Sequence, residues 1–210
     1  MLQQTLLDMK VLLLFLTAAS GCFAYGTASA QRPDLYQCEG CEALHEYVGE
    51  LSWKASIAGN DEPGERMTLT GTVYQLDGET PAGNVIVYAY HTNAEGVYPK
   101  KGNEKNWEQR HGYLRGWVET DGNGRYLFDT IRPGSYPSRQ TPAHIHMTVK
   151  EPDRTEYWIE EVVFEDDPLL EPVDRSKKNP RGGPGIIELE RTEDGTWKAV
   201  RDIVLERHPE

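Results

Sequence analysis

A pair of histidines in a short apolar segment is the first feature of the sequence that could do chemistry. In residues 144–150 polar and apolar residues alternate, which is the period of a strand with one buried face. His144 and His146 then share the outer face, with Cα atoms about 6–7 Å apart. Two imidazoles at this spacing can bind one metal ion, but an H-x-H pair alone is more typical of two exposed histidines. Three apolar residues form the opposite, core-facing side: Ile145, Met147 and Val149.

Two tyrosines lie in glycine- and proline-containing loops that follow predicted strands. Tyr136 belongs to a rigid turn at residues 132–137, eight residues before His144, and Tyr98 belongs to a similar loop at residues 93–99. Loops held on a rigid sheet are frequent positions for catalytic groups, although a single tyrosine is more often a half-buried packing residue. Two tyrosines with two histidines favour a metal site.

The chain resembles the intradiol ring-cleavage dioxygenases, a family that includes the protocatechuate and catechol dioxygenases. The resemblance extends from about residue 69 to residue 167, roughly half of the chain, and is strongest in residues 81–98, 120–137 and 142–146. The last two segments contain Thr-Asp-Gly-Asn-Gly-Arg-Tyr, Arg-Pro-Gly-Ser-Tyr-Pro and Pro-Ala-His-Ile-His, a specific signature in this order and spacing. The resemblance implies that Fe(3+) is bound by four residues: Tyr98, Tyr136, His144 and His146.

The chemistry of these four groups agrees with a ferric ion. A phenol with a pKa near 10 is a poor ligand at neutral pH unless a highly charged cation lowers that pKa, and imidazole also suits iron. By resemblance, the partners are a catechol-type substrate and O₂, and the ring opens between its two hydroxyls to a muconate-type diacid. The resemblance also gives Tyr98 a catalytic role, in which it leaves the metal and accepts a substrate proton.

The sequence departs from the best-known members of that family in three places. Thr141 stands where those enzymes have an arginine, and Arg139, two residues earlier, is a candidate to reach the same space. Glu161 replaces a glutamine near the iron, and Tyr90-His91 replaces Trp-Gln. A carboxylate at position 161 would repel an acidic substrate, so we predict a preference for neutral catechols. The candidate catalytic residues are therefore four: Tyr98, Arg139, Thr141 and Glu161.

A metal-free binding or structural module is the alternative interpretation. Residues 70–73, 81–85 and 121–136 also resemble transthyretin-like β-sandwiches that serve exported proteins as spacers or adhesion units, and fold alone does not decide function. The two tyrosines and Pro-Ala-His-Ile-His favour the enzyme. His111, in the long polar loop at residues 92–112, either lines the site or lies on the surface.

Many short strands separated by turns, with no long helix between them, predict an all-β fold. The pattern is typical of an antiparallel β-sandwich with an immunoglobulin- or transthyretin-like arrangement. Two hairpins are predicted: residues 114–120 with 125–130, and residues 186–190 with 197–205.

Three regions follow along the chain. Residues 1–30 are predicted to be a signal peptide, residues 31–66 an N-terminal segment with a CxxC motif and a linker, and residues 67–210 the dioxygenase-like β-sandwich. Within the second region, an apolar period at Leu44, Val48 and Leu51 predicts a short helix.

The first region indicates export. Lys10 precedes an apolar run at residues 11–19 that is too short to span a bilayer but suits a signal peptide. Ala-Ser-Ala at residues 28–30 is a cleavage site that would release a soluble chain beginning at Gln31. The alternative is a bacterial lipobox that leaves Cys22 lipidated as a membrane anchor. The first site is favoured because Ala19 is a weak residue for the lipobox position usually held by leucine.

Cys38 and Cys41 both remain after that cleavage. In an oxidising compartment this pair favours a small disulfide loop. A zinc site would need two further ligands, and a redox-active dithiol lacks its usual βαβ setting. The net charge of −12 argues against a nucleic acid or an anionic membrane surface as partner, because both need a basic patch.

Overall fold

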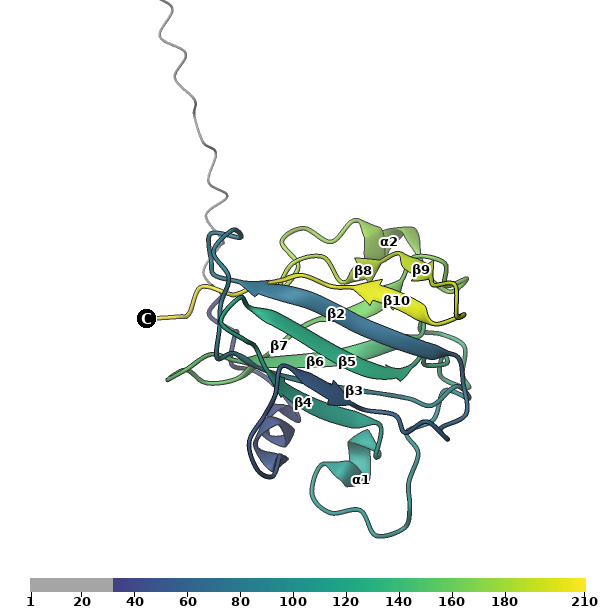
Figure 1. Ribbon diagram of the computed structural model, residues 1–210. Helices are drawn as coiled ribbons and strands as arrows, with labels where there is room; N and C mark the ends of the chain where they lie inside the picture. Colours follow the sequence, from purple (N-terminus) through teal and green to yellow (C-terminus); the bar gives the residue numbers. More distant parts are fainter. Residues whose placement is uncertain (1–31) are drawn as a thin grey trace, which may run out of the picture.

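The computed structural model describes residues 32–210, so the predicted signal peptide, the cleavage site before Gln31 and the lipobox at Cys22 lie outside the described residues. Two β-sheets pack face to face and enclose the main hydrophobic core (Figure 1). The all-β prediction is confirmed. Within residues 32–210, no helix is both long enough and apolar enough to cross a membrane.

The first sheet has the strand order β1-β5-β2-β10-β9, and β11 also pairs with β2. Its strands are β1 (Lys54–Ser56), β2 (Arg66–Tyr74), β5 (Arg125–Ile131), β9 (Leu189–Arg191), β10 (Trp197–Val200) and β11 (Ile203–Val204). The central strands β2 and β5 are antiparallel. Three other pairs are parallel, namely β1 with β5, and β10 and β11 with β2, whereas β9 and β10 are antiparallel.

The second sheet has the order β4-β3-β6-β7-β8. Its strands are β3 (Ile86–His91), β4 (Arg115–Glu119), β6 (His144–Lys150), β7 (Tyr157–Phe164) and β8 (Ile186–Ile187). All pairs are antiparallel except β7 with β8, which is parallel. Both sheets are therefore mixed, and the expectation of a purely antiparallel sandwich is corrected: antiparallel pairing holds for β2–β5, for β9–β10 and for the run β4-β3-β6-β7, and the remaining pairs are parallel.

The predicted hairpin at residues 114–130 is wrong. β4 pairs with β3 and β5 pairs with β2, so the two strands lie in opposite sheets. The turn between them is nevertheless tight, because the Asp121 carboxylate accepts hydrogen bonds from the backbone amides of Asn123 and Arg125. Turn residues predict a chain reversal, but they do not tell which sheet the next strand joins. The C-terminal hairpin is confirmed for β9 and β10.

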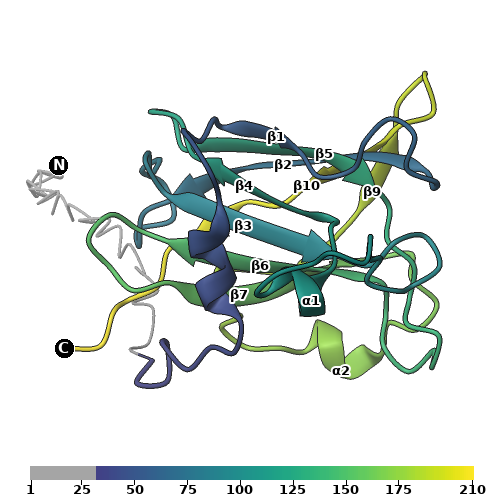
Figure 2. The ribbon, with the colours of Figure 1, turned by 90° about the horizontal axis from the view of Figure 1, so that it is seen from below.

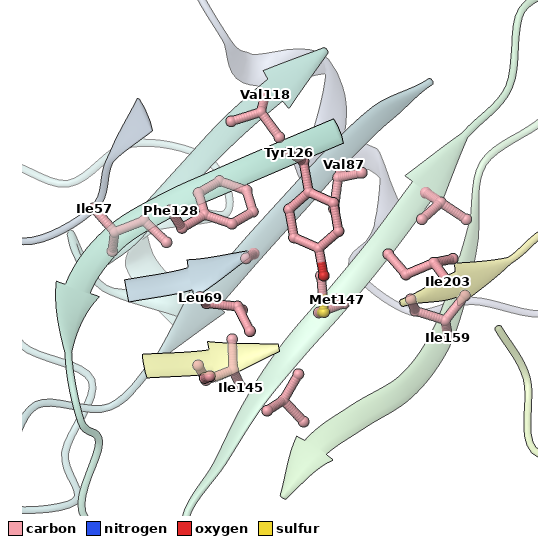
Figure 3. Close-up of a cluster of buried hydrophobic side chains, with 14 of the residues drawn as sticks. Ile57, Leu69, Val87, Val118, Tyr126, Phe128, Ile145, Met147, Ile159 and Ile203 are labelled. Carbon is pink, nitrogen blue, oxygen red and sulfur yellow. The ribbon is translucent and has the colours of Figure 1, made fainter. Parts of the chain in front are cut away.

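The core follows directly from strand alternation. In β2 every second residue is buried, and in β6 the three predicted apolar residues face the same interior. Figure 3 shows Leu69, Phe128 and Met147 meeting between the sheets, together with Tyr126, whose hydroxyl donates to the Arg201 carbonyl at 2.6 Å. Each fully buried aliphatic or aromatic side chain stabilises the fold by about 1.5–3 kcal/mol.

The N-terminal segment contributes a short cover for the second sheet. A 3₁₀ helix, η1 (Cys41–Glu46), lies across the outer face of β3 and β6 (Figure 2). Leu44 packs there against Tyr88. The predicted helix through residue 51 is corrected, since it ends at Glu46 and Val48 is 96% exposed. Two other one-turn helices are α1 (Glu108–His111) and α2 (Pro172–Arg175).

Candidate metal centre

Strand β6 places both predicted histidines on the outer face of the second sheet. The Nε2 atoms of His144 and His146 are 3.2 Å apart, and the two rings are nearly perpendicular. His144 is buried and His146 is partly buried. The period-2 argument from the sequence is confirmed, because the residue between them, Ile145, points into the core.

The two tyrosine loops are packed backbone against backbone. The Gly134 amide donates to the Asn93 carbonyl at 2.9 Å, and the Thr92 hydroxyl donates to the Gly134 carbonyl at 2.8 Å. Gly96 has φ of 80°, and a Cβ atom there would collide with the Ser135 carbonyl. Only glycine fits this position without strain. This close packing brings Tyr98 and Tyr136 together from loops that are distant in the sequence.

The four predicted ligand groups converge. The Tyr98 hydroxyl oxygen lies 2.7 Å from that of Tyr136 and 2.9 Å from Nε2 of His146. The Tyr136 oxygen lies 3.1 Å from Nε2 of His144 and 3.5 Å from Nε2 of His146. Donor atoms bound about 2.0–2.1 Å from one ion, at right to tetrahedral angles, are roughly 2.9–3.4 Å apart. The observed distances, 2.7–3.5 Å, are centred on this range, so the donor atoms lie close enough together to share one ion.

Each histidine also has a fixed partner on its other ring nitrogen. Nδ1 of His144 is 2.7 Å from the Pro142 carbonyl, and Nδ1 of His146 is 2.9 Å from Oε1 of Glu161. A carbonyl oxygen or a carboxylate can only accept, so both Nδ1 atoms carry the proton. The lone pairs of both Nε2 atoms therefore face the two phenols, as metal ligation requires.

The protonation of the site is set by burial. Burial raises the pKa of the hydroxyls of Tyr98 and Tyr136, with the neighbouring phenol adding to the effect at Tyr98. Burial also lowers the pKa of His144, assisted by the adjacent His146. Without a cation, the phenols therefore stay protonated at neutral pH. A small, highly charged cation would reverse this preference.

Glu161 reaches His146 because the β6–β7 ladder is irregular. Ile145 pairs with Val162 and Met147 pairs with Ile159, so two residues of β7, Glu160 and Glu161, oppose His146. This is a β-bulge, a feature that often lies beside functional sites. His144, His146 and Glu161 form the one metal-type cluster of His, Cys and acidic residues within residues 32–210. Glu161 is bound on the Nδ1 side of His146, away from the phenols, so it is a partner of His146 and does not join the four converging groups.

The predicted disulfide is confirmed, and it also supports the site. Cys38 and Cys41 are joined. The short loop that they close brings Gly40 against the aromatic side chains next to the metal centre: a Cβ atom on Gly40 would lie 3.1 Å from Nε2 of His111 and 3.3 Å from the Trp107 ring.

The geometry of this site agrees with the comparisons with known proteins. The Dioxygenase_C family model, described as "Dioxygenase", matches residues 45–198. The chain belongs to the intradiol ring-cleavage dioxygenase family. It thereby shares a family with proteins named as dioxygenases of protocatechuate, catechol or chlorocatechol.

Two curated relatives and one solved structure illustrate the match. The protocatechuate 3,4-dioxygenase beta chain of Burkholderia cepacia is 35% identical over 118 residues, covering 53% of this chain and 50% of the relative. Chlorocatechol 1,2-dioxygenase of Pseudomonas putida is 30% identical, covering 67% and 56%. The dioxygenase domain of a carbohydrate-binding fusion from Streptomyces sp. SirexAA-E has a TM-score of 0.56 at 21% identity, covering 83% and 99%. The chain thus spans about half the length of these curated relatives.

The three remaining candidate residues, Thr141, Arg139 and Glu161, differ in their position relative to the site. Thr141 lines a cavity of about 460 Å³ beside His144, together with Glu161 and Val163. Arg139 is exposed, has a left-handed φ of 51°, and does not line this cavity. The expectation that Arg139 replaces the missing arginine gains no support from its place in the structure, because it is exposed in the turn that follows Tyr136. Glu161 lines the cavity as well, but its carboxylate is held by His146.

Sequence reasoning missed an aromatic column beside the metal centre. The Tyr90 ring lies between His111 and His146, with centroid distances of 3.8 and 4.5 Å and nearly parallel planes. Tyr90 is the direct cross-strand neighbour of His146, so strand pairing would have revealed it. His111 is buried, its Nδ1 lies 2.8 Å from the Tyr88 hydroxyl, and burial lowers its pKa to about 4. The surface interpretation of His111 is wrong, and it supports the site from behind.

Proposed function

We propose that this chain is a non-haem Fe(3+) dioxygenase that opens catechol-type rings between their two hydroxyls with O₂ and gives muconate-type diacids. The observation that carries the proposal is the convergence of two phenol oxygens and two imidazole nitrogens, with neighbouring atoms 2.7–3.5 Å apart. The relatives support the substrate class, because their names refer to protocatechuate and chlorocatechol.

The donor set fits ferric iron. Phenols whose pKa is raised by burial become ligands only when a strongly charged cation offsets that cost. Both histidines offer unprotonated Nε2 atoms, and imidazole suits iron. The chemistry that ferric iron supplies when bound is the stabilisation of negative charge on the phenol oxygens and on the two oxygens of a catechol.

The residues of the chain have separate roles in this proposal. Tyr98 and Tyr136 hold the metal, and one of the two phenol oxygens takes up a proton from a catechol hydroxyl. The family resemblance gives this role to Tyr98, and Tyr136 is the alternative because its oxygen lies only 2.7 Å away. His144 and His146 keep fixed orientations through their Nδ1 partners. The Tyr90 ring covers one face of His146 and limits the access of water there.

The cavity beside His144 is the proposed route for the substrate. Its volume of about 460 Å³ is within the range of small-molecule sites. Four acidic and two basic side chains line it: Glu160, Glu161, Glu165, Asp174, Arg175 and Lys177. Both basic groups already pair with acids, Arg175 with Glu165 and Lys177 with Glu160. This balance favours a neutral catechol over one that carries a carboxylate.

The direct test is iron loading followed by product analysis. We expect about one ferric ion per chain, a visible tyrosinate-to-iron charge-transfer band, and O₂ uptake with catechol that yields a muconate. Tyr98→Phe and Tyr136→Phe should each weaken the band and the ring opening strongly. Tyr113→Phe is the matched control, since the Tyr113 hydroxyl binds Glu62 outside the site. Wild-type protein that stays colourless after reconstitution with Fe(3+) would contradict the proposal and favour the metal-free module.

Export of the chain stays a prediction, and we propose that the mature protein begins at Gln31 with no lipid. Intact-mass analysis of protein secreted from the native type of host distinguishes the possibilities. A mass that begins at Gln31 supports cleavage after residue 30. A diacylglyceryl adduct on Cys22 would support the lipobox instead.

A further inference from the structure

The two histidines of the metal centre have different partners on their outer nitrogens. Nδ1 of His144 donates to a neutral backbone carbonyl, that of Pro142, at 2.7 Å. Nδ1 of His146 donates to a carboxylate, that of Glu161, at 2.9 Å. A carboxylate partner increases the negative charge and the basicity of an imidazole more than a carbonyl does. The two ligands are therefore electronically unequal.

The fold holds this carboxylate in place. The β-bulge puts Glu161 opposite His146, and the Gly185 backbone packs so closely on the Glu161 carbonyl that no Cβ atom would fit at residue 185. Lys177 forms its ion pair with Glu160, the other bulge residue. Among the described residues, His146 is thus the single basic group within ion-pair distance of the Glu161 carboxylate.

The orientation of His146 is fixed independently of Glu161. The Tyr90 ring stacks on its face, and His111 stacks on the other face of Tyr90. If Glu161 only oriented the ring, a neutral acceptor of the same shape would serve as well as the carboxylate. The sequence has a carboxylate where the resembling enzymes have a glutamine, so the charge itself is the feature that needs a role.

We propose that Glu161 is a positioning residue whose negative charge makes His146 the stronger of the two histidine donors and so favours the ferric over the ferrous ion. The inference rests on the proposed iron site. Its physical basis is that added negative charge near the metal stabilises a 3+ ion more than a 2+ ion. It adds a second role to the expectation from the sequence, in which the Glu161 carboxylate near the iron repels an acidic substrate.

Glu161→Gln tests the charge alone, because the amide oxygen can still accept the hydrogen bond from Nδ1 of His146. We expect ferric affinity to fall about 10–100-fold, the charge-transfer band to move to longer wavelength, and the ferric/ferrous midpoint potential to rise. The band moves in this direction because a weaker histidine donor makes the ion a better acceptor of tyrosinate charge. The melting temperature of the iron-free protein should stay close to that of the wild type.

Glu151→Gln is the matched control. Glu151 also accepts a hydrogen bond from a histidine, His208, at 2.8 Å, and this pair is not part of the metal centre. The Glu151→Gln variant should keep the wild-type charge-transfer band, ferric/ferrous potential and ferric affinity. If Glu161→Gln binds ferric iron with wild-type affinity, colour and potential, the inference fails while the proposed function stands. If the wild-type protein binds no ferric iron, both fail together.

Discussion

The β2–β5 ladder and the β6–β7 ladder are both built from alternating polar and apolar residues, but only the second contains an irregularity. β2 and β5 pair without interruption from Arg66 with Ile131 to Thr72 with Arg125. β6 and β7 lose register at His146, where two glutamates of β7 oppose one residue of β6. The regular ladder contributes buried core residues, and the interrupted one directs polar groups at a single point. The candidate site therefore lies where the ladder is interrupted.

The largest expected effects of substitution are a loss of stability in the β2–β5 ladder and a loss of iron binding in the β6–β7 ladder. Phe128→Ala in β5 removes a fully buried ring and should lower the free energy of unfolding by about 3–5 kcal/mol. His146→Ala in β6 should abolish ferric binding and colour, while the iron-free protein loses about 1 kcal/mol or less because His146 is partly exposed. Chemical denaturation of the iron-free proteins and iron titration measure both quantities. The opposite pattern, a stable Phe128 variant or an iron-binding His146 variant, would refute this division.

A second effect should break the site without touching a ligand. Gly96→Ala places a Cβ atom against the Ser135 carbonyl at a φ of 80°. We expect a loss of about 2–3 kcal/mol of stability from the clash and the left-handed backbone. The charge-transfer band should weaken as well, because the contact holds the loops of Tyr98 and Tyr136 together. Gly102→Ala is the control: it also has positive φ but nothing lies within 4 Å of its Cβ position. Equal iron spectra for the two variants would contradict this role of Gly96.

Much of this arrangement was predictable from the sequence, and the failures have physical causes. The alternation in residues 144–150 predicted the core face and the histidine face, because side-chain direction in a strand depends only on parity. The hairpin at residues 114–130 failed because the Asp121 turn does not specify the partner strand. The roles of Tyr90 and Glu161 depend on cross-strand register and on a bulge, and neither can be obtained from one strand alone. The exposure of Arg139 depends on the conformation of the turn after Tyr136, where residue 139 has a left-handed φ, and residue type alone does not give that conformation.

A third, smaller effect concerns the link between the two sheets. His91 on β3 is fully buried, and its Nε2 lies 2.7 Å from the Thr130 hydroxyl on β5. Burial lowers the pKa of His91 to about 4, whereas an unfolded histidine has a pKa near 6.5. The unfolded state therefore binds more protons between these values. The stabilising contribution is complete above pH 6.5 and is lost as the pH falls toward 4.

His91→Gln should reduce this acid sensitivity. Between pH 7 and pH 5 the wild-type protein should lose roughly 2 kcal/mol of stability through His91, and the variant should lose that much less. Urea denaturation at both pH values, with both proteins in the same state of iron loading, measures the difference. His45→Gln, at an exposed histidine, is the control. If the His91 variant and the wild type lose the same stability on acidification, His91 is not an acid-sensitive link.

The smallest expected effect is that of substrate charge on kcat/KM, through the cavity beside His144. This cavity has four acidic and two basic side chains, and Thr141 stands where the family has an arginine. The two bases pair with two of these acids and leave Glu161 and Asp174. A substrate carboxylate about 8 Å from one such charge is repelled by roughly 2 kcal/mol at an effective dielectric of 20. Solvent screening, together with the pairing of Glu161 with His146, reduces the repulsion to about 1 kcal/mol. We therefore expect kcat/KM for catechol to exceed that for protocatechuate by about fivefold to tenfold.

Thr141→Arg should narrow this ratio by adding a positive charge beside His144, whereas Thr141→Met adds length without charge and should leave it unchanged. If protocatechuate is preferred tenfold or more by the wild-type protein, the lining acids do not act on the substrate, and the repulsion inferred from the cavity is wrong.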